Sequence, residues 1–197
     1  MLILVNKPFG FLCQFSPVAG RGTLADLVPI PGVYAAGRLD ADSEGLLVLT
    51  DDGRLQARIA DPRHKLEKGY WVQVEGLPVA PQLEILRSGV DLGDFVTRPA
   101  RVATIEEPAG LWPRVPPIRS RKSIPTAWLD VRIREGRNRQ IRRMTAKAGL
   151  PTLRLIRYRV GPWTLDDLPV GKWRVAEAEP GTHAGREPRQ PAGPPTR

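Results

Sequence analysis

Apolar and polar residues follow one another along this chain in patterns that predict four strands. Residues 1–5 form an apolar run that ends at Asn6-Lys7-Pro8; the run is too short for a signal-peptide core and predicts a buried first strand. Residues 45–50 form a second apolar run, which ends in the turn sequence Asp51-Asp52-Gly53. Residues 70–76 and 127–134 alternate between apolar and polar side chains with the period of two that is typical of half-buried strands.

Helical periodicity predicts four helices, over residues 23–28, 54–60, 81–88 and 138–148. Thr23 is the expected N-terminal cap of the first helix. Asn138 is the expected cap of the last, and Gly149 follows its end. The apolar positions of that last helix share one face, so Arg142 and Arg143 are expected to point away from it.

Strands and helices are interspersed without strict alternation, which favours an α+β fold with a mixed or antiparallel sheet over a doubly wound parallel sheet. Residues 110–125 are rich in proline and basic residues without a pattern and predict a long exposed loop. Residues 178–197 are rich in Pro, Gly and charge and predict a disordered tail. The folded part is therefore expected to be residues 1–177.

The charge of the chain indicates a polyanionic partner. Lys and Arg number 30 against 21 Asp and Glu, which gives a net charge of +9 at pH 7. RNA, DNA and anionic lipid are the polyanions that such a surface attracts. A membrane partner is not expected, because the chain has no run of 18 apolar residues and no lipidation signal.

The cysteine and histidine content excludes two further classes of site. The single cysteine, Cys13, rules out an internal disulfide and suits a reducing cytoplasm. His64 and His183 are too far apart in the sequence to give the ligand spacing of a zinc site.

The segment between Arg132 and Arg159 carries ten basic residues, nine of them Arg, and one acidic residue, Glu135. Arg forks onto phosphate oxygens and stacks on bases, so this segment indicates folded RNA rather than a lipid surface. A solvated helix face and strand edge is the alternative explanation, and basic character alone says nothing of catalysis.

Residues 36–45 combine three carboxylates, Asp40, Asp42 and Glu44, with glycines at both ends. Glycines allow tight backbone turns, and loops held by rigid strands commonly present reactive groups. Two other interpretations stay open. The segment lacks EF-hand spacing but could hold a metal ion, or it is a surface turn in which Asp40 or Ser43 caps backbone N–H groups.

Four motifs, in order, resemble those of the ribosomal-RNA pseudouridine synthases. Gly37-Arg38-Leu39-Asp40, followed by Ser43-x-Gly45-Leu46-Leu47-Val48-Leu49-Thr50-x-Asp52-Gly53, is similar to the family signature, with Ser43 where the family commonly has Thr. The other three are Asn6-Lys7-Pro8-x-Gly10, Lys68-Gly69-Tyr70 and Glu135-Gly136-Arg137-Asn138-Arg139-Gln140-Ile141-Arg142-Arg143-Met144, with Arg157 and Gly161-Pro162 downstream. The loop 110–125 matches no motif.

The resemblance implies a pseudouridine synthase fold, with a mainly antiparallel sheet in two fused subdomains and a catalytic cleft between them. It is closest to a member acting on the large ribosomal subunit, because the chain starts at the catalytic domain and leaves no room for an S4-type RNA-binding domain. It also implies an isomerase without cofactor or metal. The expected partner is large-subunit ribosomal RNA, free or in an assembling particle, and neither DNA nor a second copy of the chain is expected.

The resemblance assigns roles to individual residues. Asp40 is implied as the catalytic carboxylate, acting either as a nucleophile at the ribose or as a base that gives a glycal. Arg142 is expected to pair with it through both oxygens and keep it ionised. Tyr70 is expected to lie against the target uracil and help move a proton, with core packing as the alternative. Further substrate contacts are expected from Arg38, Lys68, Arg137, Arg139, Gln140, Ile141, Arg143 and Arg157.

Two rival functions stay open. A non-catalytic RNA-binding or assembly factor explains the charge but leaves Asp40 and its flanking glycines unexplained. A retaining glycosidase needs a second carboxylate about 5 Å from the first, which only Asp42 or Glu44 could supply. A glycosidase function would also leave the basic surface unexplained.

Overall fold

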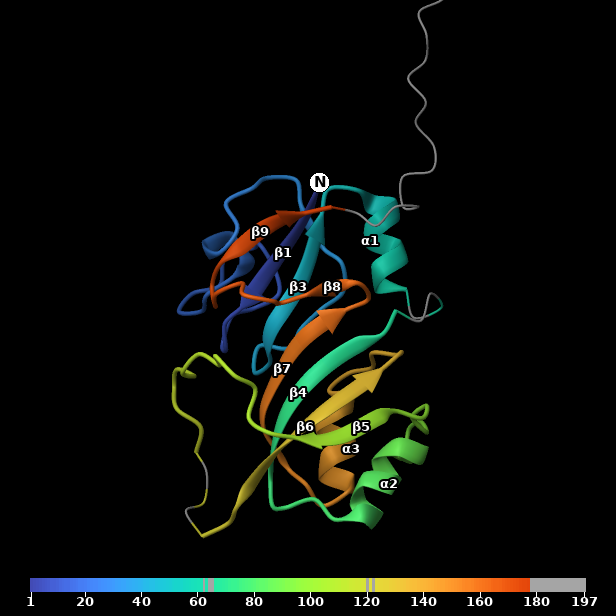
Figure 1. The fold of residues 1–197 in the computed structure, drawn as a ribbon. Helices are drawn as coiled ribbons and strands as arrows, with labels where there is room; N and C mark the ends of the chain where they lie inside the picture. Colours follow the sequence, from blue (N-terminus) through green and yellow to red (C-terminus); the bar gives the residue numbers. More distant parts are fainter. Residues whose placement is uncertain (62, 64–65, 120, 122, 178–197) are drawn as a thin grey trace, which may run out of the picture.

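Figure 1 shows the computed structural model, which describes residues 1–61, 63, 66–119, 121 and 123–177. The described part is an α+β structure built on a mixed nine-stranded sheet in the order β5-β6-β4-β7-β3-β1-β9, with β2 paired to β3 and β8 to β7. The strands are β1 (Leu2–Lys7), β2 (Tyr34–Ala35), β3 (Glu44–Thr50), β4 (Lys68–Glu75), β5 (Arg101–Ile105), β6 (Thr126–Ile133), β7 (Thr152–Val160), β8 (Trp163–Thr164) and β9 (Trp173–Ala176). The helices are α1 (Gly53–Ala60), α2 (Ala80–Ser88), α3 (Gln140–Lys147) and a 3-10 turn (Leu24–Asp26).

The sheet has two halves that meet at a short parallel contact. β1, β3 and β9 form one half and β4, β5 and β6 the other, each held by antiparallel pairs, while β7 runs antiparallel to β4 and parallel to β3. The parallel contact pairs Glu44 with Ile156 and Gly45 with Arg157. The expected α+β fold with a mainly antiparallel sheet in two fused halves is confirmed.

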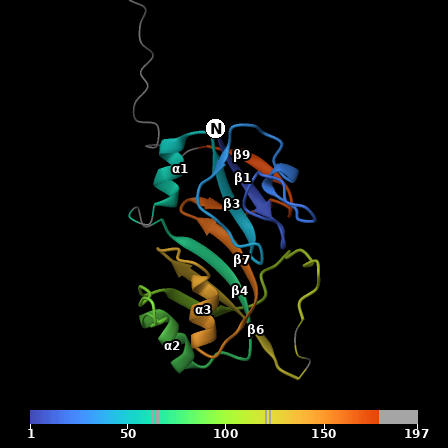
Figure 2. The ribbon, with the colours of Figure 1, turned by 180° about the vertical axis from the view of Figure 1, so that it is seen from behind.

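Each half buries its own apolar side chains. α2 and α3 cover one face of the β4–β6 half (Figure 2), where Val72, Leu129 and Met144 share a core cluster. In the other half, alternate residues of β3 enter different clusters: Leu46 lies in the cluster that includes α1, and Leu47 lies in the cluster under the N-terminal loop. Burial on both faces explains why β3 reads as a continuous apolar run.

The predicted strands are confirmed as β1, β3, β4 and β6, and the predicted helices as the 3-10 turn, α1, α2 and α3. One cap is wrong, because Arg139 rather than Asn138 is the N-cap of α3. Sequence periodicity missed β7, whose pattern is obscured by two buried arginines, Arg154 and Arg157.

The sequence predicted that the loop 110–125 is exposed. The start of this loop is instead bonded to the sheet. Trp112 donates a hydrogen bond of 2.7 Å to the carboxylate of Glu44. The guanidinium of Arg154 in turn binds both Glu44 and the Trp112 carbonyl. This buried cluster fastens the start of the loop to β3 and β7.

The predicted tail, residues 178–197, lies outside the described residues. Within the described part, no helix has the length and apolar character needed to cross a bilayer.

Candidate active site

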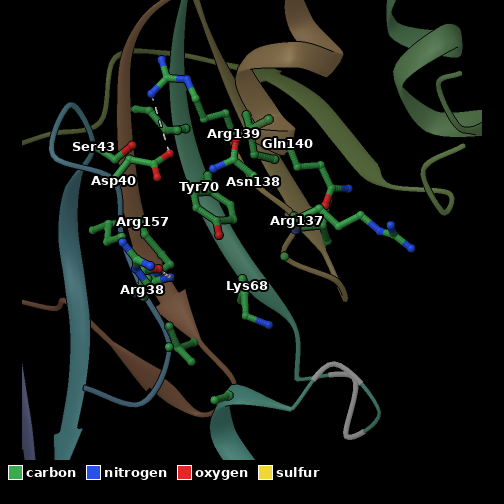
Figure 3. A pocket seen from close by; sticks show the side chains of 18 of the residues that line it. Arg38, Asp40, Ser43, Lys68, Tyr70, Arg137, Asn138, Arg139, Gln140 and Arg157 are labelled. Carbon is green, nitrogen blue, oxygen red and sulfur yellow. Dashed lines mark hydrogen bonds and ion pairs between the residues drawn. The ribbon is translucent and has the colours of Figure 1, made fainter. Parts of the chain in front are cut away.

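A cavity of about 420 Å³ opens where the two halves of the sheet meet. Figure 3 shows side chains that line it, which come from the loop 36–43, the end of α1, the start of β4, the segment from the end of β6 to the start of α3, and β7. Polar residues among them are Arg38, Asp40, Ser43, Lys68, Tyr70, Arg137, Asn138, Arg139, Gln140 and Arg157. Ile59, Ile133, Leu155 and Val160 supply much of the apolar wall.

The loop that carries Asp40 is held by its backbone. The Ser43 amide donates to the Asp40 carbonyl at 3.1 Å, and the Gly10 amide of the first motif donates to the Ala41 carbonyl at 2.7 Å. Gly37 takes a φ of 93°, a left-handed value that L side chains rarely adopt. Asp40 therefore points into the cavity from a fixed turn, with its side chain 38% exposed.

Arg139, not Arg142, is the arginine near the Asp40 carboxylate. Its Nη1 lies 3.9 Å from Asp40 Oδ2 (Figure 3). No ion pair joins Asp40 to Arg142 within the described part of the chain. The expected bidentate pairing of Arg142 with Asp40 is therefore wrong.

Both arginines hold Asp42 instead. Arg139 grips the two Asp42 oxygens at 3.1 and 2.7 Å. Arg142 donates to the Asp42 carbonyl at 2.6 Å, and its Nε lies 3.4 Å from Oδ2 without hydrogen-bond geometry. Burial acts to raise the pKa of Asp42, but the bond from Arg139 and the charge of Arg142 outweigh it, so this pKa is lowered.

The glycosidase alternative finds no second carboxylate among the described residues that line the cavity. Asp42 does not line it, and both of its oxygens accept bonds from Arg139, an arrangement that also keeps the pKa of Asp42 low rather than raised as a general acid requires. Glu44 is no substitute, because it is buried against Arg154 and Trp112 rather than lining the cavity.

Arg139 has an unusual backbone. It caps the N-terminus of α3 with a φ of 48° and a ψ of 31°, a left-handed conformation that costs a non-glycine residue roughly 1 kcal/mol or more. The contacts of its side chain with Asp42 help to hold it there. Such strain is concentrated at functional sites, which agrees with the position of Arg139 at the mouth of the cavity.

Tyr70 and three basic residues occupy the rest of the cavity. The Tyr70 ring lies between Asp40 and Lys68 in the view of Figure 3. Arg157 is buried, with Nε donating to the Leu46 carbonyl at 2.8 Å and Nη1 to the Arg38 carbonyl at 3.3 Å. Burial, and then the charge of Arg157, lower the pKa of Lys68.

Nine of the eleven residues expected at the site line the cavity: Arg38, Asp40, Lys68, Tyr70, Arg137, Arg139, Gln140, Ile141 and Arg157. The other two do not line it: Arg142 donates to the Asp42 carbonyl, and Arg143 binds Asp94 and the Leu92 carbonyl. Arg143 was expected to contact substrate; it lies outside the cavity, and its contact with RNA stays a prediction. Gln140 is buried and bonds to Glu135 and the Arg137 amide, so its side chain also supports the loop.

Sequence reasoning missed the part played by Asp42. Its position two residues from Asp40 was visible, as was the arginine-rich third motif, but these segments are 97 residues apart in the chain. Only folding shows that they meet. Metal binding by the carboxylates finds no support, because the described residues include no group of three or more His, Cys, Asp or Glu placed to hold an ion.

Comparisons with known proteins agree on one family. Residues 1–147 match the family described as RNA pseudouridylate synthase. A ribosomal large subunit pseudouridine synthase E from Xanthomonas campestris is 59% identical over 180 residues, 90% of this chain and 96% of that protein. A protein of the same name from Vibrio vulnificus is 58% identical over 173 residues, 88% of this chain and 74% of that protein. A crystal structure of a pseudouridylate synthase superposes with a TM-score of 0.73 at 28% identity, covering 88% of this chain and 68% of that one.

Proposed function

The chain belongs to the RNA pseudouridylate synthase family, and we propose that its substrate is a specific uridine in large-subunit ribosomal RNA, which it isomerises to pseudouridine. The substrate is inferred from relatives that are named for the large subunit and are 59% and 58% identical to this chain over the aligned residues. The observation that carries the proposal is Asp40, which points into a nucleotide-sized cavity beside Tyr70 and several basic side chains.

The reaction breaks the bond between ribose C1′ and uracil N1, turns the base and joins C1′ to C5. Asp40 acts at the ribose, as nucleophile or as base, and Tyr70 lies against the uracil. Arg139 supplies the positive charge beside Asp40, and Asp42 positions Arg139 and Arg142. Arg38, Arg137 and Ile141 contact the RNA around a nucleotide that has been turned out of its stack.

Three further expectations belong to the same proposal. The catalytic domain comprises residues 1–177, and residues 178–197 form a tail outside it. The protein works as a monomer in the cytoplasm, on ribosomal RNA that is free or in an assembling particle. The basic residues of the segment 132–159 that face solvent add phosphate contacts that strengthen binding.

The test is conversion of large-subunit RNA by the purified protein, with modified sites mapped and compared with RNA from cells lacking it. Asp40→Asn is the matched variant, because the amide keeps the shape and removes the charge. We expect wild type to convert one site and Asp40→Asn to retain less than about a tenth of the rate, a barrier increase above roughly 1.4 kcal/mol, with RNA affinity little changed.

The RNA-binding-factor alternative predicts a different result. A wild-type protein that binds this RNA tightly but converts no uridine would refute the enzyme proposal. An Asp40→Asn protein with nearly normal turnover would refute the role of Asp40 alone.

A further inference from the structure

The end of the cavity away from Asp40 holds positive charge without a carboxylate to balance it. Lys68, Arg157 and Arg38 all line the cavity. Among the residues that the structure describes, none of the three takes part in an ion pair. Other arginines do, among them Arg101, Arg132, Arg134, Arg139, Arg142 and Arg154. Lys68 and Arg157 bond instead to backbone carbonyls of described residues.

The fold holds two of these charges in place at a cost. Arg157 is only 4% exposed, and Gly45 packs directly on its backbone. Lys68 Nζ donates a single long bond of 3.3 Å to the Leu66 carbonyl. Burial of two neighbouring cations is unfavourable unless an anion joins them, and burial, followed by the charge of Arg157, lowers the pKa of Lys68.

The order of groups along the cavity matches the parts of a nucleotide. In the view of Figure 3, Asp40 lies at the upper end of the cavity beside the Tyr70 ring, and Arg157 and Lys68 lie lower, Arg157 on the same side of the ring as Asp40 and Lys68 on the other. With Asp40 at ribose C1′ and the uracil against Tyr70, a base that extends down the cavity would bring its far edge, which carries O4, toward Lys68 and Arg157.

That edge gains negative charge during the reaction. When the C1′–N1 bond breaks, its electron pair stays on the base, and the charge of the resulting uracil anion spreads over N1, O2 and O4. C1′ is left bonded to Asp40, or Asp40 takes the C2′ proton and a C1′–C2′ double bond forms, in which case that proton returns to C2′ when C5 bonds to C1′. The charge on the base is cancelled when C5 bonds to C1′, C5 loses its proton and N1 gains one, so the product is an isomer of the substrate.

We propose that Lys68 and Arg157 form an anion subsite that stabilises the detached uracil. This inference rests on the proposed function and deepens it, because it assigns catalytic electrostatics to the cavity end opposite Asp40. Preorganised cations in a water-poor cavity stabilise a developing charge without reorganising, which lowers the barrier to bond breaking. They also keep the free base in the cavity while it turns.

The experiment compares Lys68→Met with wild type in single-turnover reactions on two transcripts, one with uridine and one with 5-fluorouridine at the converted site. Met keeps the length of the side chain and removes its charge. We expect the saturating rate on uridine RNA to fall by roughly tenfold to a hundredfold, with RNA affinity changed less than about threefold. On 5-fluorouridine RNA, where C5 has no proton to lose, the rate followed is the disappearance of the N1-linked nucleoside in RNA digests. There the loss should be several times smaller, because fluorine stabilises the anion itself.

Two further proteins complete the design. Lys68→Arg keeps the positive charge and should recover most of the rate. Lys172→Met removes an exposed lysine that does not line the cavity and should behave as wild type. Melting temperatures of all variants show whether a loss is due to unfolding.

Each outcome is decisive. Equal losses on the two transcripts, or a weakened RNA affinity with a normal saturating rate, would overturn the subsite; the second result would mean that Lys68 holds a phosphate. Failure of wild type to convert uridine refutes the proposed function, whereas a normal Lys68→Met with active wild type refutes the subsite only.

Discussion

Two carboxylates separated by one residue have different chemistry in this protein because their neighbours differ. Asp40 is partly exposed in the cavity, with one arginine nitrogen 3.9 Å away. Asp42 is gripped by Arg139 and contacted by Arg142, and its pKa is lowered. Because Arg139 and Arg142 bind Asp42, the Asp40 oxygens are left available to a substrate.

Lys7 of the first motif shows how much one buried charge affects stability. Its side chain is fully buried and donates to the carbonyls of Pro8 and Phe11, both at 2.9 Å. Burial lowers the pKa of Lys7 to about 8, although the acidic groups near it oppose the shift. Between that value and 10.5 the unfolded chain holds the proton and the folded protein does not, so unfolding becomes less favourable as the pH rises.

We therefore expect the unfolding free energy of wild type, relative to Lys7→Met, to increase by up to about 3 kcal/mol from pH about 7.5 to about 10.5. Urea unfolding of both proteins at the two pH values measures it. Because Met cannot titrate, the variant controls for every other group. A difference that stays constant, or shrinks, with rising pH would contradict the lowered pKa.

At the scale of the elements, the parallel contact between β3 and β7 joins the two halves of the sheet. Gly45 has a φ of 103°, and a Cβ added there would lie 2.3 Å from the Arg157 carbonyl oxygen. The neighbouring Glu44 binds Arg154 and Trp112 and so fastens the loop 110–125 at the same place. This junction therefore sets the shape of the cavity.

Gly45→Ala should destabilise the protein by more than about 3 kcal/mol, because a left-handed backbone and a collision with backbone atoms act together. Thermal or urea unfolding gives the change. Gly53→Ala is the matched control: Gly53 begins α1, a Cβ there meets nothing within 4 Å, and alanine favours helix, so we expect no loss. Equal stability of the two variants would contradict the close approach of β3 and β7.

At the scale of the whole molecule, positive charge and the cavity act together. Residues 178–197 contribute Arg186, Arg189 and Arg197 against Glu179 and Glu187, so nearly all of the net charge of +9 belongs to residues 1–177. The basic side chains at the cavity and on the surface around it are therefore the main source of attraction for RNA.

A protein ending at residue 177 should keep the melting temperature, the conversion rate and the salt dependence of RNA binding within error of the full chain. The slope of log affinity against log salt is the informative measurement, since it counts the phosphates neutralised. A slope that falls by more than about one unit, or a melting temperature lower by many degrees, would show that residues 178–197 take part in binding or folding.

The sequence by itself determined the strands β1, β3, β4 and β6, the helices, the basic charge and the family, because apolar periodicity and short motifs are local properties of the chain. It also brought Asp40, Tyr70 and Lys68 forward as site residues. Only the tertiary structure decided which arginine meets which carboxylate, that Arg143 lies outside the cavity, and that Arg154 and Arg157 are buried in β7. Those contacts join residues about a hundred or more positions apart, or depend on which face a side chain takes, so they are set by the packing of the two halves and not by any local pattern.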